Sequence, residues 1–290
     1  MTHQAYWLQT YLDWTTFMHE TSIVDLTAES IKDYQTCALL YQFRNIDDLY
    51  EPIPSRDLMS LKYENTLKKL AAFFFYKRQG GIVPSMSAIL NRWEKLWFPK
   101  EVSAYDIAVE KHESIWGNLS SMNTKAVNCI MKFYEDFSLD IKDPLLINEN
   151  FTVGMSRDIR VSGVFDLVLR DPKSKKISVI KWLASPKRPN LSTLSMDFTI
   201  LKYAFENKNQ GKDLDIDFYA YDLGSNKNGF TQIDITDSDI NNLIYWSEEI
   251  SNAKVFPPRR GLTYYCKKCP FDSPCRDFCI TNDMVVDKNV

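Results

Sequence analysis

The sequence predicts an α/β protein with a mixed sheet core, a helical N-terminal zone and a C-terminal cysteine loop. Apolar residues recur at three- and four-residue spacing through the first part of the chain and alternate over short runs after about residue 144. Cys266, Cys269 and Cys275 then lie close together near the end. With 290 residues, 44% of them hydrophobic and 25% charged, the composition is that of a folded globular protein.

The N-terminal zone, residues 1–143, is expected to be helical. Thr27 is a plausible N-cap for a helix over 27–45, and Gly80, Gly81 and Pro84 interrupt the helical pattern. The segments with helical spacing are 27–45, 64–79, 85–97 and 126–137.

The core, residues 144–255, is expected to combine strands with helices. Strands are predicted over 145–153, 159–171 and 175–185, and the turn "DPKSKK" joins the last two. A helix over 191–207, strands over 215–223 and 230–235, and a helix over 238–253 follow. The cysteine loop then occupies 256–280 and a tail 281–290.

Charge and hydropathy argue against several classes of protein. The net charge of −3 and the pI near 5.7 give no global argument for nucleic-acid binding, which would need local basic patches. We find no run of about 18 apolar residues and no secretory signal pattern at the start. We therefore expect a cytoplasmic protein, in which clustered cysteines bind metal more often than they form disulfides.

The cysteine spacing predicts a metal site but leaves its fourth ligand open. Cys266, Cys269 and Cys275 form a C-x2-C-x5-C pattern, in which a two-residue gap lets both thiolates face one metal. Cys279 would complete a local zinc site, whereas Cys37 would complete a site that joins distant parts of the chain. On spacing alone the two are equal. Cys129 is interpreted as a buried apolar residue.

The strand zone carries a resemblance to a known family. "FTVGMSRDIRVSGVFDLVLRDPKSKKISVIKW", with Gly163-x-x-Asp166 followed by a hairpin, is similar to the core of the PD-(D/E)XK nuclease superfamily. "SIKDYQTCALLYQF" resembles the S-x3-Y-x2-C-x3-Y opening of its iron–sulfur RecB-like and AddB-like branch, which includes the CRISPR-adaptation exonucleases. The resemblance spans residues 27–278 and implies a restriction-endonuclease-like α/β fold.

In that branch an early cysteine joins a C-terminal C-x2-C-x5-C to hold a [4Fe-4S] cluster. The resemblance therefore favours the cluster over the zinc site and implies that its ligands are Cys37, Cys266, Cys269 and Cys275. Such a cluster would close the chain into one structural unit and would have a structural role.

The catalytic positions that the resemblance implies are incomplete. The mechanism needs carboxylates that hold Mg²⁺ and a lysine beside them. Asp166 supplies the first acid, but Lys181 and Leu183 stand where acid-x-Lys belongs. No Asp or Glu occurs between Asp171 and Asp197, so a shift of register does not restore the motif.

Other signposts of the site are also altered. Asp171-Pro-Lys173 spells acid-x-Lys, but it lies in the predicted turn, too close to Asp166 to face it from the next strand. The family's Gln-x-x-x-Tyr is Thr199-x-x-x-Tyr203 here, and the early-helix histidine is missing from 60–74. The predicted remnant site, without bound Mg²⁺, consists of Asp166, Lys181 and Tyr203.

Lys181 is expected to form an ion pair with Asp166 and to repel Mg²⁺. The alternative is that Lys181 extends to solvent and Asp166 caps a turn. Basic residues near the predicted cleft are candidates for phosphate contacts, with nearby aromatic rings for stacking, although they equally suit a solvated surface. The basic candidates are Lys187, Arg188, Arg259 and Arg260, with Lys267 and Lys268; the aromatic ones are Trp182, Tyr264 and Tyr265.

Two classes of function follow. The first is a catalytically impaired, nuclease-like pseudoenzyme that acts as a structural or assembly subunit, or as a module that binds single-stranded DNA or DNA ends, in a larger complex. The second is an active RecB-like exonuclease whose acid is displaced to Glu149 or Asp197, with a migrated Lys187 or Lys202. The resemblance includes phage-encoded relatives, for which a virion-associated location replaces the cytoplasmic one.

Overall fold

The computed structural model describes residues 23–49, 55–101, 118–186, 190–209, 214–224, 229–259, 266 and 269–281. By their contacts, the residues fall into two compact units, which are described separately. Unit 1 takes in Met1–Leu49, Thr152–Gly163 and Asp237–Val290, and unit 2 takes in Tyr50–Phe151 and Val164–Thr236. Each unit therefore combines segments that are distant in the sequence, and the closure of the chain into one unit by a cluster stays a prediction.

The first described element of unit 1 is a strand that the sequence pattern did not indicate. The elements of this unit are β1 (Val24–Leu26), α2 (Ala28–Thr36), α3 (Ala38–Tyr41), the π-helical turn η1 (Gln42–Ile46), α9 (Asp237–Asn252) and α11 (Asp272–Thr281). The predicted N-cap Thr27 is confirmed, because its hydroxyl accepts from the Ser30 amide while the Ser30 hydroxyl accepts from the Thr27 amide. β1 was missed because three residues are too few to show alternation.

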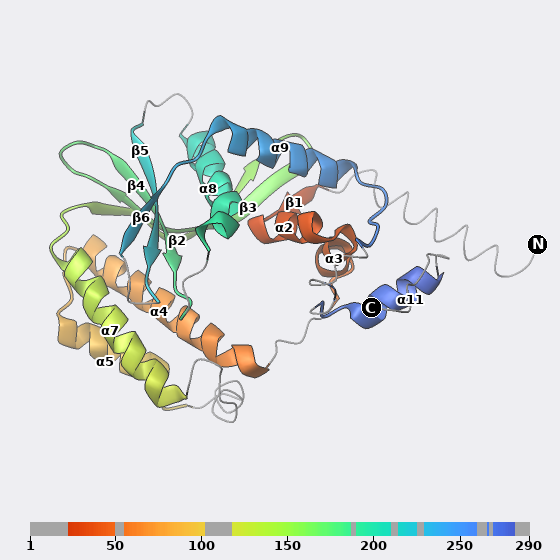
Figure 1. Cartoon of the computed structure of the whole chain (residues 1–290). Helices are drawn as coiled ribbons and strands as arrows, with labels where there is room; N and C mark the ends of the chain where they lie inside the picture. Colours follow the sequence, from red (N-terminus) through yellow and green to blue (C-terminus); the bar gives the residue numbers. More distant parts are fainter. Residues whose placement is uncertain are drawn as a thin grey trace, which may run out of the picture. The chain divides into compact units, whose positions relative to one another are not determined.

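Unit 2 places long helices beside the strands (Figure 1). Asn118 caps α7, since its side chain accepts from the Ser121 amide at 2.9 Å, and Ser85 caps α5 in the same way through the Ala88 amide at 3.2 Å. The helices are α4 (Ser55–Gln79), α5 (Met86–Trp97), α7 (Leu119–Ser138), the 3₁₀ turn η2 (Leu191–Leu194) and α8 (Ser195–Lys208). The strands are β2 (Asp143–Gly154), β3 (Ile159–Arg170), β4 (Ile177–Leu183), β5 (Ile216–Asp222) and β6 (Phe230–Ile233), although the end of β2 and the start of β3, within Thr152–Gly163, belong to unit 1.

The strands form a mixed sheet. In the described part of the chain, the order is β1-β3-β4-β5-β6, and β2 also pairs with β3. The β3–β4 pair is antiparallel, β4–β5 is parallel and β5–β6 is antiparallel. A parallel pair requires a crossover, which α8 supplies between β4 and β5. The predicted α/β class with a mixed sheet is thus confirmed, and strand, hairpin, strand and helix follow in the expected order.

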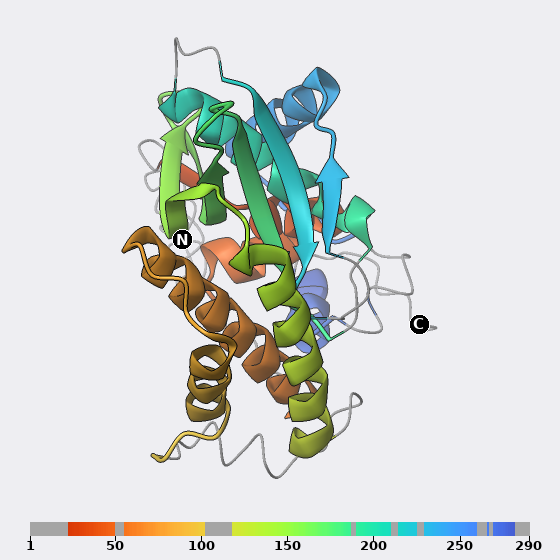
Figure 2. The ribbon, with the colours of Figure 1, turned by 90° about the vertical axis from the view of Figure 1, so that its left-hand side faces the viewer.

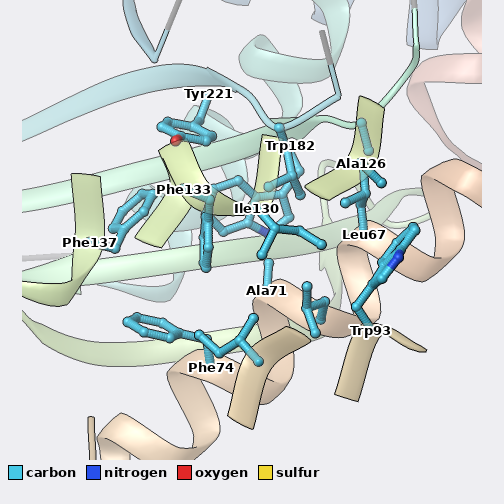
Figure 3. Packing of buried hydrophobic residues seen from close by; sticks show 14 of the residues in the cluster. Leu67, Ala71, Phe74, Trp93, Ala126, Ile130, Phe133, Phe137, Trp182 and Tyr221 are labelled. Atoms are coloured by element: carbon cyan, nitrogen blue, oxygen red, sulfur yellow. The ribbon is translucent and has the colours of Figure 1, made fainter. Parts of the chain in front are cut away.

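The core of unit 2 lies between α4, α5 and α7 and one face of the strands. Figure 2 shows these helices below the strands. In Figure 3, side chains of α4 and α7 point toward one another and toward Trp182 of β4 and Tyr221 of β5. Phe133 of α7 lies in the middle, with ring centroids 5.2 Å from Phe74 and 6.2 Å from Trp182. Apolar burial of this kind is the main term that holds helices on a sheet.

Among the described residues, no helix combines the length and the apolar composition that crossing a bilayer requires.

Candidate functional site

The predicted remnant site lies on β3 and β4, at the end of the ladder that pairs these two strands. The ladder between β3 and β4 ends at the pair Leu167 and Ile180. One residue further along each strand lie Asp166 and Lys181. At this point the Trp182 amide donates a hydrogen bond of 2.9 Å to Oδ2 of the half-buried Asp166. The Asp166 carboxylate is therefore held by the backbone of the next strand.

Lys181 forms an ion pair with a residue of α8. Its Nζ lies 3.2 Å from Asp197 Oδ1, and the two side chains are 23% and 18% exposed. Because side chains alternate along a strand and Trp182 enters the helical core, Lys181 and Leu183 face the opposite side, toward α8. This corrects the expected partner, since among the described residues Lys181 forms its ion pair with Asp197 and not with Asp166. Sequence order alone does not show that α8 brings a carboxylate over β4.

The other positions of the remnant site have local roles. Leu183 is buried, so this position holds an apolar side chain in the core. Thr199 is also buried, and its hydroxyl donates to the Ser195 carbonyl at 2.9 Å. Tyr203 lies one helical turn after Thr199 on α8 and is half-buried.

The hairpin interpretation of Asp171 is confirmed. Its carboxylate accepts from the amides of Lys173 and Ser174 at 2.8 and 2.9 Å, and these hydrogen bonds lower the pKa of Asp171. The carboxylate therefore caps the turn between β3 and β4, as Asp residues commonly do.

Two of the four residues proposed as displaced catalytic groups are engaged elsewhere. Glu149 pairs with Lys208 at 3.4 Å, and Lys202 donates to the Ile235 carbonyl at 3.0 Å. Lys187 lies outside the described residues. Asp197 is the one alternative acid that the described residues bring to the remnant site, through Lys181.

In unit 1, Cys37 lies at a break between two helices. The sequence predicted a continuous helix over 27–45, but Cys37 is extended, with φ −162° and ψ 121°, and separates α2 from α3. Its Sγ accepts a hydrogen bond of 3.4 Å from the Arg259 amide. The break takes the half-buried thiol out of a regular helical face and places it beside the segment that leads to the C-terminal cysteines.

The C-terminal cysteines gather near Cys37 around a small apolar cluster. Cys37, Cys269 and Cys275 all pack against the cluster formed by Leu39, Phe43 and Phe271. The Cys269 amide donates to the Cys266 carbonyl at 3.2 Å. Cys275 lies in the first turn of α11, and not in a loop as expected.

The thiol of Cys269 is influenced by its neighbours. Burial raises the pKa of Cys269, and the nearby thiols of Cys37 and Cys266 raise it further, whereas the Phe271 amide and Arg44 lower it. Arg44 pairs with Asp33 at 2.7 Å and lies over the Phe271 ring at 6.0 Å. This cation beside the cysteines was not identified from the sequence, because only the turn η1 brings it there.

These thiols are the donor type that an iron–sulfur or zinc group needs, and they lie near one another, but they do not surround a common metal position. Among the described residues, no group of three or more His, Cys, Asp or Glu is arranged to hold a metal ion. Cys37, not Cys279, is among the groups that shift the pKa of Cys269. Cys279 is fully buried in α11 and is not among the residues packed on the cluster of Leu39, Phe43 and Phe271.

Most predicted nucleic-acid contacts fall outside the described residues, namely Lys187, Arg188, Arg260, Tyr264, Tyr265, Lys267 and Lys268. Arg259 is exposed, and its guanidinium donates to the Gln35 carbonyl at 2.5 Å. Trp182 is 4% exposed within the aromatic core, so the suggestion that it stacks on bases is wrong. Its large apolar side chain gains more by burial in the core.

No family model matches the chain, and no curated protein matches it by sequence. Among solved structures, it is similar to a protein from Eubacterium rectale described as "Putative exonuclease". The identity is 12% and the TM-score 0.42, over 100% of this chain and 96% of that protein. We draw no functional argument from a similarity of this size.

Proposed function

We propose that the chain is a catalytically impaired, nuclease-like protein, stabilised by a [4Fe-4S] cluster. Its role is that of a structural or assembly subunit, or of a nucleic-acid-binding module, in a larger complex. The observation that carries the proposal is Lys181, which stands in the place of a metal-binding acid and pairs with Asp197 at 3.2 Å.

The charges around Lys181 oppose a bound divalent cation. Mg²⁺ requires oxygen ligands in near-octahedral geometry and is normally held by carboxylates. Here the ammonium of Lys181 neutralises Asp197, and one oxygen of Asp166 accepts the Trp182 amide. Asp166 is thus left as a single acid beside a fixed positive charge, which disfavours both Mg²⁺ binding and the metal-assisted attack of water.

A cleavage assay tests the proposal. Purified full-length chain is incubated with Mg²⁺ or Mn²⁺ and end-labelled single-stranded or duplex DNA, and we expect no cleavage above background. Asp166→Asn serves as the matched control and should give the same background. If the natural chain cleaves DNA and Asp166→Asn abolishes the cleavage, the proposal is wrong.

A binding measurement tests the cause of the impairment. Lys181→Glu restores a second acid opposite Asp166, and calorimetry should then detect Mn²⁺ binding that the natural chain lacks. Adding Leu183→Lys restores the complete acid-x-Lys pattern, although a lysine at this buried position costs stability. Thermal unfolding checks that each variant is folded.

One observation favours the second candidate, an active exonuclease. Asp197 is the acid that α8 brings to Lys181, so Asp166 and Asp197 would bind the metal while Lys181 stabilises the developing charge. In that case cleavage occurs, and Asp197→Asn and Lys181→Met each abolish it as Asp166→Asn does.

The proposed cluster uses Cys37, Cys266, Cys269 and Cys275. It is supported by the packing of Cys37, Cys269 and Cys275 around one apolar cluster and by the effect of Cys37 and Cys266 on the pKa of Cys269. When bound, such a group joins α2 and α3 to α11 by iron–thiolate bonds. Since these thiols must lose protons to bind iron, cluster formation should weaken as the pH falls.

Iron analysis tests the cluster. Protein purified without oxygen should be brown, absorb near about 400 nm and hold about four iron and four sulfide per chain. Cys37→Ala should remove most of the iron, and the control Cys279→Ala should retain it. Colourless protein with one zinc, unaffected by Cys37→Ala but lost in Cys279→Ala, would establish the local zinc site instead.

The proposed DNA contacts are Lys187, Arg188, Arg259 and Arg260. Reversing all four charges should lower affinity for single-stranded DNA and flatten its salt dependence, with each lost phosphate contact changing the slope by about 0.7. If no DNA binding occurs even at low salt, the role as a structural subunit remains.

A further inference from the structure

A basic cavity of about 630 Å³ lies beside α4 and α5 in unit 2. None of the described residues that line it is acidic, although the chain as a whole carries a net charge of −3. The side chains that define it are Lys68, Lys69, Phe73, Tyr76 and Lys77 of α4 and Arg92 of α5. These six residues are referred to as the α4 groove.

The α4 groove follows one side of a long helix. The positions of α4 that line the cavity run from Asn65 to Lys77 in alternating steps of three residues and one residue, and they share one helical face. At about 1.5 Å per residue, this stretch is about 18 Å long. A nucleic-acid strand, with a rise of about 3.4 Å per nucleotide in a helix, could follow it for several nucleotides.

Among the described residues, no carboxylate forms an ion pair with the cations of the groove. Within the described parts of the chain, Lys68, Lys69, Lys77 and Arg92 make no salt bridge, in contrast with Lys181 and the other paired lysines. Lys77 and Arg92 instead lie over the Phe73 ring, at 5.9 and 5.6 Å from its centroid. The groove therefore presents a local positive field on an acidic protein, as a site for a polyanion requires.

An exposed aromatic ring lies among these cations. Tyr76 is 54% exposed, so its ring is open to a ligand in the groove. Its hydroxyl donates a hydrogen bond of 2.9 Å to the Ile147 carbonyl of β2. The ring is therefore held at both ends, which reduces the entropy lost when a planar ligand stacks on it.

We propose that the α4 groove binds single-stranded nucleic acid, with the cations contacting phosphates and Tyr76 stacking on a base. A fixed aromatic ring among cations that form no ion pair with the described residues suits a strand with exposed bases better than an acidic peptide, which offers charge without flat rings. The inference deepens the proposed nucleic-acid-binding role. It does not depend on whether the Asp166 site cleaves.

The charge test measures anisotropy of a labelled oligothymidylate of about 12 nucleotides with the full chain, between about 50 and 300 mM NaCl. The triple variant Lys69→Gln, Lys77→Gln, Arg92→Gln should bind at least about tenfold more weakly at low salt. Its slope of log K against log salt should be smaller by about 2, which is about 0.7 for each lost contact. The matched control removes three exposed cations outside the groove, in Lys95→Gln, Arg170→Gln and Lys173→Gln, and should bind like the natural chain.

The stacking test compares two changes at one position. Tyr76→Phe keeps the ring and loses only the hydrogen bond to Ile147, so binding should remain within about twofold. Tyr76→Leu keeps apolar bulk without a ring and should weaken binding about fivefold or more, because stacking is lost. Thermal unfolding confirms that both variants are folded.

Three results would overturn the inference: no binding at low salt, equal losses in the groove and control triples, or competition by polyglutamate with no effect of Tyr76→Leu. The last would assign the groove to an acidic protein partner. If binding depends only on Lys187, Arg188, Arg259 and Arg260, the α4 groove fails as a site while the proposed nucleic-acid-binding role survives.

Discussion

The ion pair between Lys181 and Asp197 should couple β4 to α8 measurably. The perturbation is a double-mutant cycle with Lys181→Met, Asp197→Asn and the combined variant. Direct attraction at 3.2 Å amounts to about 5 kcal/mol at an effective dielectric of about 20. Desolvation and the loss of side-chain freedom offset most of this gain.

The exposed fractions fix the expected size of the coupling. Fully exposed pairs contribute about 0.2–1 kcal/mol, and breaking a fully buried pair costs about 3–5 kcal/mol. Lys181 and Asp197 are 23% and 18% exposed, so solvent screening is partial and we expect a coupling of about 1–2 kcal/mol. The cycle also subtracts the other contacts of each residue, which a single variant would not do.

Urea denaturation of the four proteins measures the coupling, and a second pair serves as the control. Lys208 and Glu149 lie at a similar distance of 3.4 Å but are 37% and 48% exposed, so their coupling should stay below about 0.5 kcal/mol. Adding about 1 M NaCl should remove the weaker coupling first. Equal couplings for the two pairs would refute the view that the Lys181 pair is partly shielded from water and occupies the metal position.

Two further predictions concern the core and the acid response. Phe133→Ala removes a ring that is 1% exposed and should lower the free energy of unfolding by about 3–5 kcal/mol, whereas Met131→Ala, 45% exposed on the same helix, should change it little in urea denaturation. Burial alone would raise the pKa of Asp217, but the hydrogen bond from Lys176 is among the contacts that outweigh it and leave the pKa below its ordinary value. The resulting stability is present above about pH 4 and is lost as the pH falls through the lowered pKa, so Asp217→Asn should show a smaller drop in melting temperature on acidification than the natural chain. A drop as large as that of the natural chain or of the exposed control Asp143→Asn would contradict this.

The sequence by itself determined the element types and their order over most of the described chain. Helical spacing identified parts of α4, α5 and α7, and the turn chemistry of Asp171 located the β3–β4 hairpin. These features depend on contacts between residues near one another in the chain, so the local pattern contains them. Of the capping box at the start of α2, the sequence identified the N-cap Thr27 but not its partner Ser30.

The sequence also located Asp166 and Lys181 as facing positions, but it did not identify the partner of Lys181. The register that ends at Leu167 and Ile180 places the two residues side by side on β3 and β4. That Asp197 approaches Lys181 depends on how α8 packs on the sheet. Helix packing is set by side chains from several elements at once, and no local pattern contains it.

Only the tertiary structure decided which residues are accessible. Trp182, a candidate for base stacking in the sequence, is buried by helices that lie far from it in the chain, whereas Tyr76 remains 54% exposed beside the cations of the α4 groove. Cys37 leaves the helical pattern at a single extended residue and thereby lies beside Arg259 and the cysteines near the C-terminus. Burial and proximity are sums over long-range contacts, so the sequence named the candidate residues while packing determined which of them reach solvent or one another.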